Sequence, residues 1–335
     1  MSIPRVKTRC FAIALAPIVI FWMHDVISGQ LFSKDLNVPV EILQDDRHWM
    51  ESAGRFRFLS ATWFFAALTV LAVALVIRDL AAPMARATRA AATLTMGVIL
   101  MLALTATVKQ HADPDGPRIY HRLGEDVFET ALSYGNLPGC NQPEDWWFLG
   151  QCGENPVLSL FNRVMDIING LAGLGVGALI VGMILCLQTQ ETRNAEEEAA
   201  LLAQNLTRMR RQLYLSSLIL TFGMFFATSW MYWPLPLVTG AERDAYGALI
   251  LASALFTGTY FCLLILSFYI PVALVLDARV RALTRSADLG SDADPDEWAA
   301  ARGLKGGTSD LLRTGFAVTA PILAAFAGGI SPISL

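Results

Sequence analysis

The chain has 335 residues, of which 54% are hydrophobic and only 16% are charged, and its formal net charge is −4. Soluble domains carry about 25% charged residues, and the apolar residues here stand in long unbroken blocks, which excludes a single soluble core. Basic patches interleaved with aromatic residues are also lacking, so we expect no nucleic-acid partner. The sequence therefore predicts an all-α polytopic membrane protein that lies in a lipid bilayer.

In chain order, six apolar blocks are long enough to cross a bilayer, because about 20 residues of helix span its hydrocarbon core. They cover residues 10–29, 58–77, 90–108, 167–187, 213–233 and 245–276. The last of these contains Pro271, which removes a helix hydrogen bond and predicts a kink. A seventh stretch, 315–335, is uncharged but rich in Ala, Gly, Ser and Pro. It either spans the membrane, re-enters it, or packs on the bundle.

The distribution of charge predicts the orientation of these spans. If the N-terminus lies inside, the connections on that side hold 16 of the 25 Lys and Arg residues, and the outer connections hold 17 of the 29 Asp and Glu residues. The positive-inside rule then places the N-terminus in the cytoplasm. An Ala-rich composition with more Arg than Lys favours a bacterial inner membrane. We expect a six-span bundle over 1–276, a cytoplasmic linker over 277–314 and a C-terminal apolar segment over 315–335.

The outer connections 30–57 and 109–160 are long enough to form a small extracytoplasmic cap. Cys140 and Cys152 are the only cysteines of the chain in a loop, and that loop lies on the outer side. An oxidising compartment permits a disulfide, so we predict that these two cysteines pair; the alternative is two free thiols.

Segment 188–212 is charged and has the composition of a helix. We expect it to continue the fourth and fifth spans into the cytoplasm. Its Glu196, Glu197 and Glu198 would then pair with Arg208, Arg210 and Arg211 across an antiparallel turn. The segment is either a solvated cap that follows the positive-inside rule or a docking site for a cytoplasmic partner.

A set of histidines and carboxylates follows the third span. His111, Asp113 and Asp115 alternate, and His121, Glu125 and Glu129 stand at i, i+4 and i+8, which places them on one face if the segment is helical. Imidazole and carboxylate groups are ligands for zinc and other divalent metals. The pattern predicts either a metal site on the outer face or a solvated acidic helix face.

The fourth span is rich in glycine. Its Gly173, Gly175, Gly177 and Ala178 match the spacing of a dinucleotide-binding loop, but that loop needs a preceding strand and an exposed helix start. Within an apolar span, small residues instead allow helices to approach closely. We therefore interpret Gly170, Gly173 and Gly177 as packing positions, inside the bundle or at a contact between copies of the chain.

Polar residues at the outer ends of three spans form a second candidate site. His24 and Asp25 end the first span, Lys109 ends the third, and Asp166 and Asn169 begin the fourth. Charges near lipid are costly and tend to be paired or functional. The group is either an ion-pair network, with Asp25 bonded to Lys109, or the entry to an ion path.

Three functional classes follow. The first is an oligomeric pore or channel with an acidic outer mouth, since rings of carboxylates select cations. The second is a non-catalytic subunit of a larger membrane complex. The third is a membrane enzyme or sensor that uses the outer metal site. No metalloprotease, P-loop, nucleophile-elbow or kinase motif is present in the sequence, so an enzyme is the less favoured class.

Overall fold

The computed structural model describes residues 3–31, 48–112, 123–124, 156–192, 194–238, 240–287 and 294–330. Within these ranges the chain is helical apart from its connections and an isolated antiparallel bridge between Arg5 and Thr189. Seven of the described helices are long and apolar enough to cross a membrane. The prediction of an all-helical chain is confirmed for the described residues, and several of its helices have the length and composition that a membrane span needs. The connections expected to form the outer cap lie largely outside the described residues.

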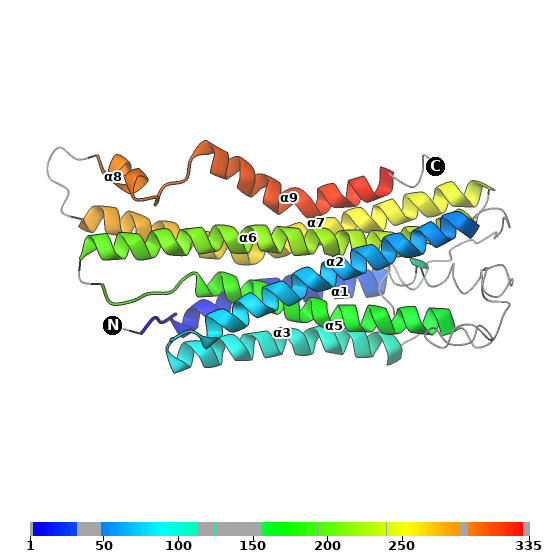
Figure 1. The fold of residues 1–335 in the computed structure, drawn as a ribbon, viewed down its shortest axis with the longest axis horizontal. Helices are drawn as coiled ribbons and strands as arrows, with labels where there is room; N and C mark the ends of the chain where they lie inside the picture. The colour runs from blue at the N-terminus through cyan, green and yellow to red at the C-terminus, as the bar shows by residue number, and fades with distance from the viewer. Residues whose placement is uncertain are drawn as a thin grey trace.

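The long helices run alternately in opposite directions, so the first and last described residues lie at opposite ends of the bundle (Figure 1). We call these ends the N-terminal face and the opposite face. The seven helices are α1 (Leu15–Leu31), α2 (His48–Ala81), α3 (Arg86–Ala112), α5 (Pro156–Leu185), α6 (Ala195–Tyr232), α7 (Gly240–Ser286) and α9 (Thr308–Ile330). Three short helices join them: η1 (Thr8–Ala14), η4 (Leu235–Leu237) and α8 (Pro295–Ala301).

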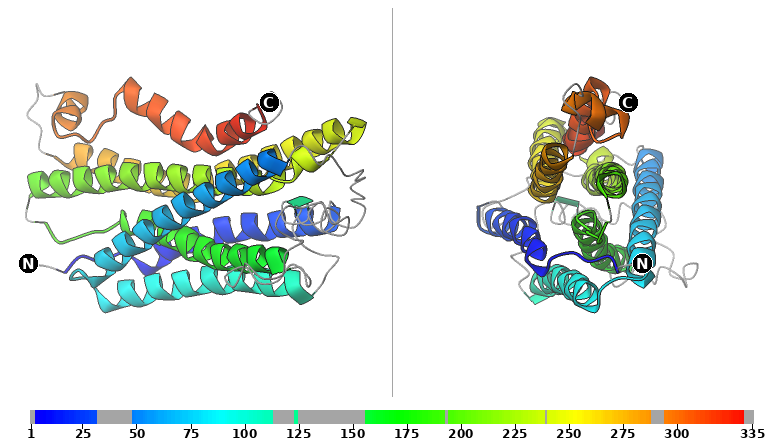
Figure 2. Two further views of the ribbon diagram at one scale, coloured as in Figure 1. Left: turned by 45° about the vertical axis from the view of Figure 1, so that its right-hand side comes forward. Right: turned by 90° about the vertical axis from the view of Figure 1, so that its left-hand side faces the viewer.

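Helices α5 and α6 form the centre of the bundle, and the other long helices surround them (Figure 2, right). Helix α2 packs against both of them, α3 packs on α5, and α7 packs on α6. Helix α1 packs mainly on α7 and η1, and most of its length is exposed outside the bundle. This arrangement follows the sequence, because the glycine-rich fourth block becomes the central helix α5.

The C-terminal apolar segment belongs to α9, which begins at Thr308 and packs along both α6 and α7. Gly258 on α7 allows this contact, because a Cβ there would lie 3.0 Å from the Cα of Ile322. The stretch is therefore long and apolar enough to act as a seventh span, in addition to the six blocks. Segment 277–314, expected to be a linker, contains the end of α7 and all of α8.

The N-terminal face is joined by backbone hydrogen bonds between segments distant in sequence. Arg5 and Thr189 exchange two bonds, of 3.0 and 2.8 Å, and the Ala85 amide donates to the Pro4 carbonyl at 3.1 Å. The Val6 amide donates to the hydroxyl of Thr88 at 3.0 Å. The first described residues therefore connect the turn before α3 to the segment after α5.

The predicted pairing of three glutamates with three arginines across a turn is wrong. Helix α6 runs unbroken from Ala195, so Glu196–Glu198 and Arg208–Arg211 lie on the same helix, and α5 already ends at Leu185. Asn194 caps α6 by accepting a hydrogen bond from the Glu197 amide. Helix α6 has 38 residues and is therefore about 57 Å long, whereas the hydrocarbon core of a bilayer is about 30 Å thick. Its charged first half therefore extends beyond the uncharged stretch 213–232.

Two ion pairs attach the segment around α8 to this charged half of α6. The guanidinium of Arg302 donates to both carboxylate oxygens of Glu196, with Nε at 3.0 and 3.1 Å, and Arg210 lies 3.2 Å from Asp310. Arg302 also lies over the ring of Trp298 at 4.2 Å. Part of the surface expected to dock a cytoplasmic partner is therefore occupied by the chain itself.

Candidate functional site

Six helices enclose a cavity of about 140 Å³ in the interior of the bundle, which we call the central cavity. Its walls come from α1, α2, α3, α5, α6 and α7. Most of the lining side chains are aliphatic or aromatic, and the polar ones are His24, Asn169, Thr257 and Tyr260. The lining contains no Asp, Glu, Lys or Arg.

The cavity exists because small residues from three helices meet around it. These residues are Ala103 on α3, Ala172 and Gly173 on α5, and Gly223 and Ala227 on α6. Gly173 is in such close contact with Ala103 that a Cβ on the glycine would overlap the Cβ of the alanine. At Gly223, a Cβ would lie 3.3 Å from the ring of Phe65. The backbones therefore approach closely, and no large side chain fills the space beside them.

His24 lies in the wall that α1 contributes. Its imidazole stacks on the ring of Tyr260, with centroids 4.0 Å apart and an interplanar angle of 28°, and it also stacks on Phe256 at 5.2 Å. Stacked rings of this kind hold an imidazole in a fixed plane. His24 is thereby positioned by α7, the helix on which α1 chiefly packs.

The four polar groups give the cavity hydrogen-bonding capacity, and His24 is the member best suited to proton transfer. An imidazole, an amide and two hydroxyls supply hydrogen-bond donors and acceptors. No group of three His, Cys, Asp or Glu side chains suited to a metal ion occurs among the described residues. Such a site can orient a ligand that carries carbonyl or hydroxyl oxygens.

The structure brings together two members of the predicted polar cluster, because His24 and Asn169 both line the central cavity. Asp25 follows His24 on α1, and Asp166 precedes Asn169 by one turn of α5; neither lines the cavity. Lys109 belongs to the last turn of α3, and its side chain lies outside the described part. The ion pair between Asp25 and Lys109 stays a prediction.

The predicted metal site falls mostly outside the described residues. His111 belongs to α3, while Asp113, Asp115, His121, Glu125 and Glu129 lie beyond what the structure describes. Cys140 and Cys152 lie outside it as well, so their disulfide stays a prediction. The described cysteines, Cys10, Cys186 and Cys262, are free thiols.

The glycines of α5 lie at helix contacts within the chain. Ideal Cβ atoms on Gly170 and Gly177 would lie 3.8 Å from Leu104 and 3.6 Å from Met96, both on α3. Gly175 faces α2, where a Cβ would lie 2.8 Å from Thr69. The close approaches that glycine permits are therefore used between α5 and its neighbours α2 and α3.

Tyr260, Phe256 and Thr257 were not identified from the sequence. They lie in the block 245–276, which has no charged residue and no histidine, so charge and metal-ligand patterns do not single them out. The signal was the run Thr257-Gly258-Thr259-Tyr260, which places three hydroxyls inside an otherwise apolar span.

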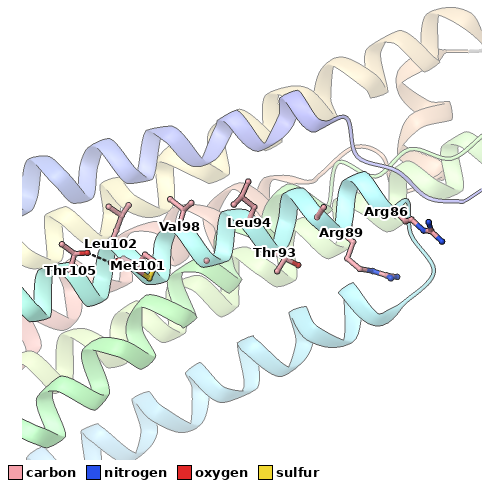
Figure 3. A pocket seen from close by; sticks show the side chains of 10 residues that line it. Arg86, Arg89, Thr93, Leu94, Val98, Met101, Leu102 and Thr105 are labelled. Carbon is pink, nitrogen blue, oxygen red and sulfur yellow. Dashed lines mark hydrogen bonds between the residues drawn. The ribbon is translucent and has the colours of Figure 1, made fainter.

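A second concave surface lies along one face of α3 and is lined by that helix alone, from Arg86 and Arg89 to Thr105 (Figure 3). A Cβ on Gly97 would have no atom within 4 Å, and Leu94 and Met101 are exposed. Thr105 donates to the Met101 carbonyl at 2.7 Å within the helix. In a bilayer this face would contact lipid chains.

Comparison of the chain with protein-family models, with curated proteins and with solved structures found no match. The function is therefore argued from the geometry of the chain.

Proposed function

We propose that the chain is a multi-pass membrane protein that binds a small bilayer-soluble molecule in the central cavity. The observation that carries the proposal is the cavity itself, an apolar space among six helices with four polar side chains on its walls. This is the composition of ligand sites in general, which are mostly apolar with a few well-placed polar groups.

The size of the cavity restricts the ligand. An apolar cavity of about 150 Å³ accommodates benzene, and the central cavity measures about 140 Å³. A single ring therefore fits, and its oxygen substituents would meet His24 and Asn169. The class that combines these features with solubility in lipid is a ring-headed lipid such as a quinone or a phenol, whose tail stays in the bilayer.

Access to the cavity would come from the side, past α1. This helix packs mainly on α7 and η1, and it stands apart from α5 in the end-on view (Figure 2, right). Since α1 carries His24, a movement of α1 would both open the cavity and move one of its polar groups.

The pore expected from the sequence is supported less well by this geometry. A pore built around the glycine-rich helix would need α5 at an axis between copies of the chain. Here α2, α3 and α6 pack around α5 within one chain, and the cavity walls have no charged residue. The N-terminal face would lie in the cytoplasm of a bacterial inner membrane, because the connections that the sequence assigns to that side hold 16 of the 25 basic residues.

The test is thermal unfolding of the purified full-length protein in detergent. The probes are a 1,4-benzoquinone with a short alkyl chain and an alkylbenzene of the same size. Both should raise the melting temperature, because a ligand that binds only the folded state stabilises it. The quinone should bind more tightly, since the alkylbenzene cannot use the polar groups.

Three variants separate the contributions of the polar groups and of the cavity volume to ligand binding. His24→Phe keeps an aromatic ring beside Tyr260 and should weaken quinone binding about three- to tenfold, the usual effect of one neutral hydrogen bond, without affecting alkylbenzene. Asn169→Leu should act in the same way. Ala172→Leu fills the cavity and should abolish both effects. Unchanged melting temperatures with both probes, or undiminished binding in Ala172→Leu, would refute the proposal.

A further inference from the structure

A groove separate from the central cavity lies on the outside of the bundle, where α2, α6 and α9 meet. It measures about 390 Å³, and its lining includes Arg57, Phe64, Phe222, Thr228, Tyr232 and Gly328. We call it the Arg57 groove. Gly328 brings α9 against α6, because a Cβ there would lie 3.1 Å from the hydroxyl of Thr228.

The two ends of the groove differ in character. Rings form the wall at one end: Phe64 stacks on Phe222, with centroids 5.2 Å apart and an angle of 18°, and Phe222 meets Phe225 edge-on at 5.8 Å. Arg57 and Tyr232 mark the other end. An apolar wall with a cation at one end matches an amphipathic anion.

The depth of Arg57 fits the headgroup layer of a membrane. Arg57 and Arg78 bracket the 20 uncharged residues 58–77 of α2. Such a stretch is about 30 Å long, which equals the hydrocarbon thickness of a bilayer. Arg57 is therefore level with lipid phosphates at the opposite face, and Phe64 lies about two turns deeper, among acyl chains.

Two polar groups of the groove lack partners in the described structure. Arg57 forms no ion pair or hydrogen bond with a described residue, while the neighbouring Arg55 lies over the ring of Trp233. Tyr232 is 4% exposed, and its hydroxyl is buried without a hydrogen-bond partner among the described residues. A buried hydroxyl without a partner is costly, so this group indicates an external acceptor.

We propose that the Arg57 groove binds an anionic phospholipid. The guanidinium of Arg57 bonds the phosphate, the hydroxyl of Tyr232 donates to a headgroup or ester oxygen, and an acyl chain runs along Phe64 and Phe222. Arginine suits this role because its planar fork donates two hydrogen bonds to phosphate oxygens. The lipid would join α9 to α2, two helices that otherwise meet through α6.

The experiment is native mass spectrometry of the full chain, released from detergent containing equal amounts of dioleoyl phosphatidylglycerol and dioleoyl phosphatidylcholine. The wild-type chain should retain one phosphatidylglycerol in preference to phosphatidylcholine. Arg57→Gln should reduce this preference about tenfold, the effect of losing a charge-assisted hydrogen bond. Arg243→Gln, on α7 at the same face but outside the groove, should not change it.

Tyr232→Phe separates binding from folding. Without lipid, it should leave the melting temperature unchanged or raise it, because a buried hydroxyl without a partner is removed. With lipid present, it should retain less phosphatidylglycerol than the wild type. A variant that had merely damaged the fold would instead have a lower melting temperature in both conditions.

Equal retention of the two lipids by the wild-type chain would overturn the proposal, as would equal effects of Arg57→Gln and Arg243→Gln. Millimolar inorganic phosphate should not raise the melting temperature. If it did so as much as phosphatidylglycerol, the occupant would be a free anion and the lipid assignment would be wrong. The outcome for the central cavity is separate, because the two sites share the helices α2 and α6 but no lining residue.

Discussion

Gly124 lies against the indole of Trp230 so closely that a Cβ on the glycine would overlap the Nε1 and Cε2 atoms of the ring. Trp230 is fully buried and packs with Phe58 and Trp233. The neighbouring Leu123 is also fully buried, and its carbonyl lies 2.5 Å from the hydroxyl of Tyr246. A dipeptide from the connection between α3 and α5 is thus part of the core at the opposite face.

Gly124→Ala should therefore destabilise the protein by about 1–3 kcal/mol, the usual cost of overpacking a core, and should change the tryptophan fluorescence. The control is Gly247→Ala on α7, where a Cβ would have no atom within 4 Å and alanine favours the helix. Urea unfolding followed by circular dichroism measures both. Equal stability of the two variants would contradict the packing of Gly124.

Gly173→Ala should also destabilise the protein by about 1–3 kcal/mol, because α5 would be forced away from Ala103 on α3. Gly97→Ala, on the exposed face of α3, should be neutral or stabilise it by about 0.5–1 kcal/mol through helix propensity. Comparing these two variants distinguishes a glycine that is needed where two helices of the chain pack from a glycine on the exposed surface. A loss of stability in Gly97→Ala that depends on protein concentration would instead indicate a contact between copies.

The ion pair between Glu196 and Arg302 should respond to acid. The hydrogen bond between the two side chains lowers the pKa of Glu196 below its ordinary value and raises the pKa of Arg302. A depressed carboxyl pKa contributes stability above the unfolded-state pKa, about 4.3 for glutamate, and this contribution is lost as the pH falls through the folded-state value.

A double-mutant cycle with Glu196→Gln and Arg302→Gln measures this effect by thermal unfolding. The coupling should be present at neutral pH, should weaken in high salt because both groups are accessible to solvent, and should vanish in acid. A coupling that stays constant between pH 7 and pH 3 would show that the charge of Glu196 contributes nothing.

Helix α9 should carry the chain across the membrane. Single cysteines introduced at Ser309 and at Ala327, near the two ends of α9, should react with an impermeant maleimide from opposite sides in a chain that otherwise lacks cysteine. A cysteine at Lys7 gives the reference for the N-terminal face. Labelling of positions 309 and 327 from the same side would mean that α9 re-enters the membrane.

The sequence predicted the helical class, because an uncharged block of about 20 residues satisfies its backbone hydrogen bonds in a bilayer by forming a helix. It also predicted that His24 and Asn169 belong near one another, since both interrupt apolar spans at a similar depth. It did not predict Tyr260 or the cavity, which depends on Ala103, Gly173 and Gly223 meeting from three helices. Small residues show where helices can approach, but not which helices do so.

The pairing of charges on α6 was mispredicted for a related reason. Glutamates followed by arginines suggested a turn between them, because opposite charges attract. Nothing local breaks the helix between Glu198 and Arg208, and the actual partners, Arg302 and Asp310, are about 100 residues away in sequence. Asp310 is brought close by the packing of α9 on α6, and Arg302 follows directly after α8, the short helix that precedes α9.

The position of α9 has a consequence for the order of assembly. Helix α9 is synthesised after α6 and α7 and packs on both of them. At about 5–20 residues per second, their apolar flank stays uncovered for several seconds after α7 is made. A nascent chain that stalls before residue 308 would leave the apolar surface of α6 and α7 exposed. The quality-control machinery of the membrane would then encounter an intermediate of six long helices without α9.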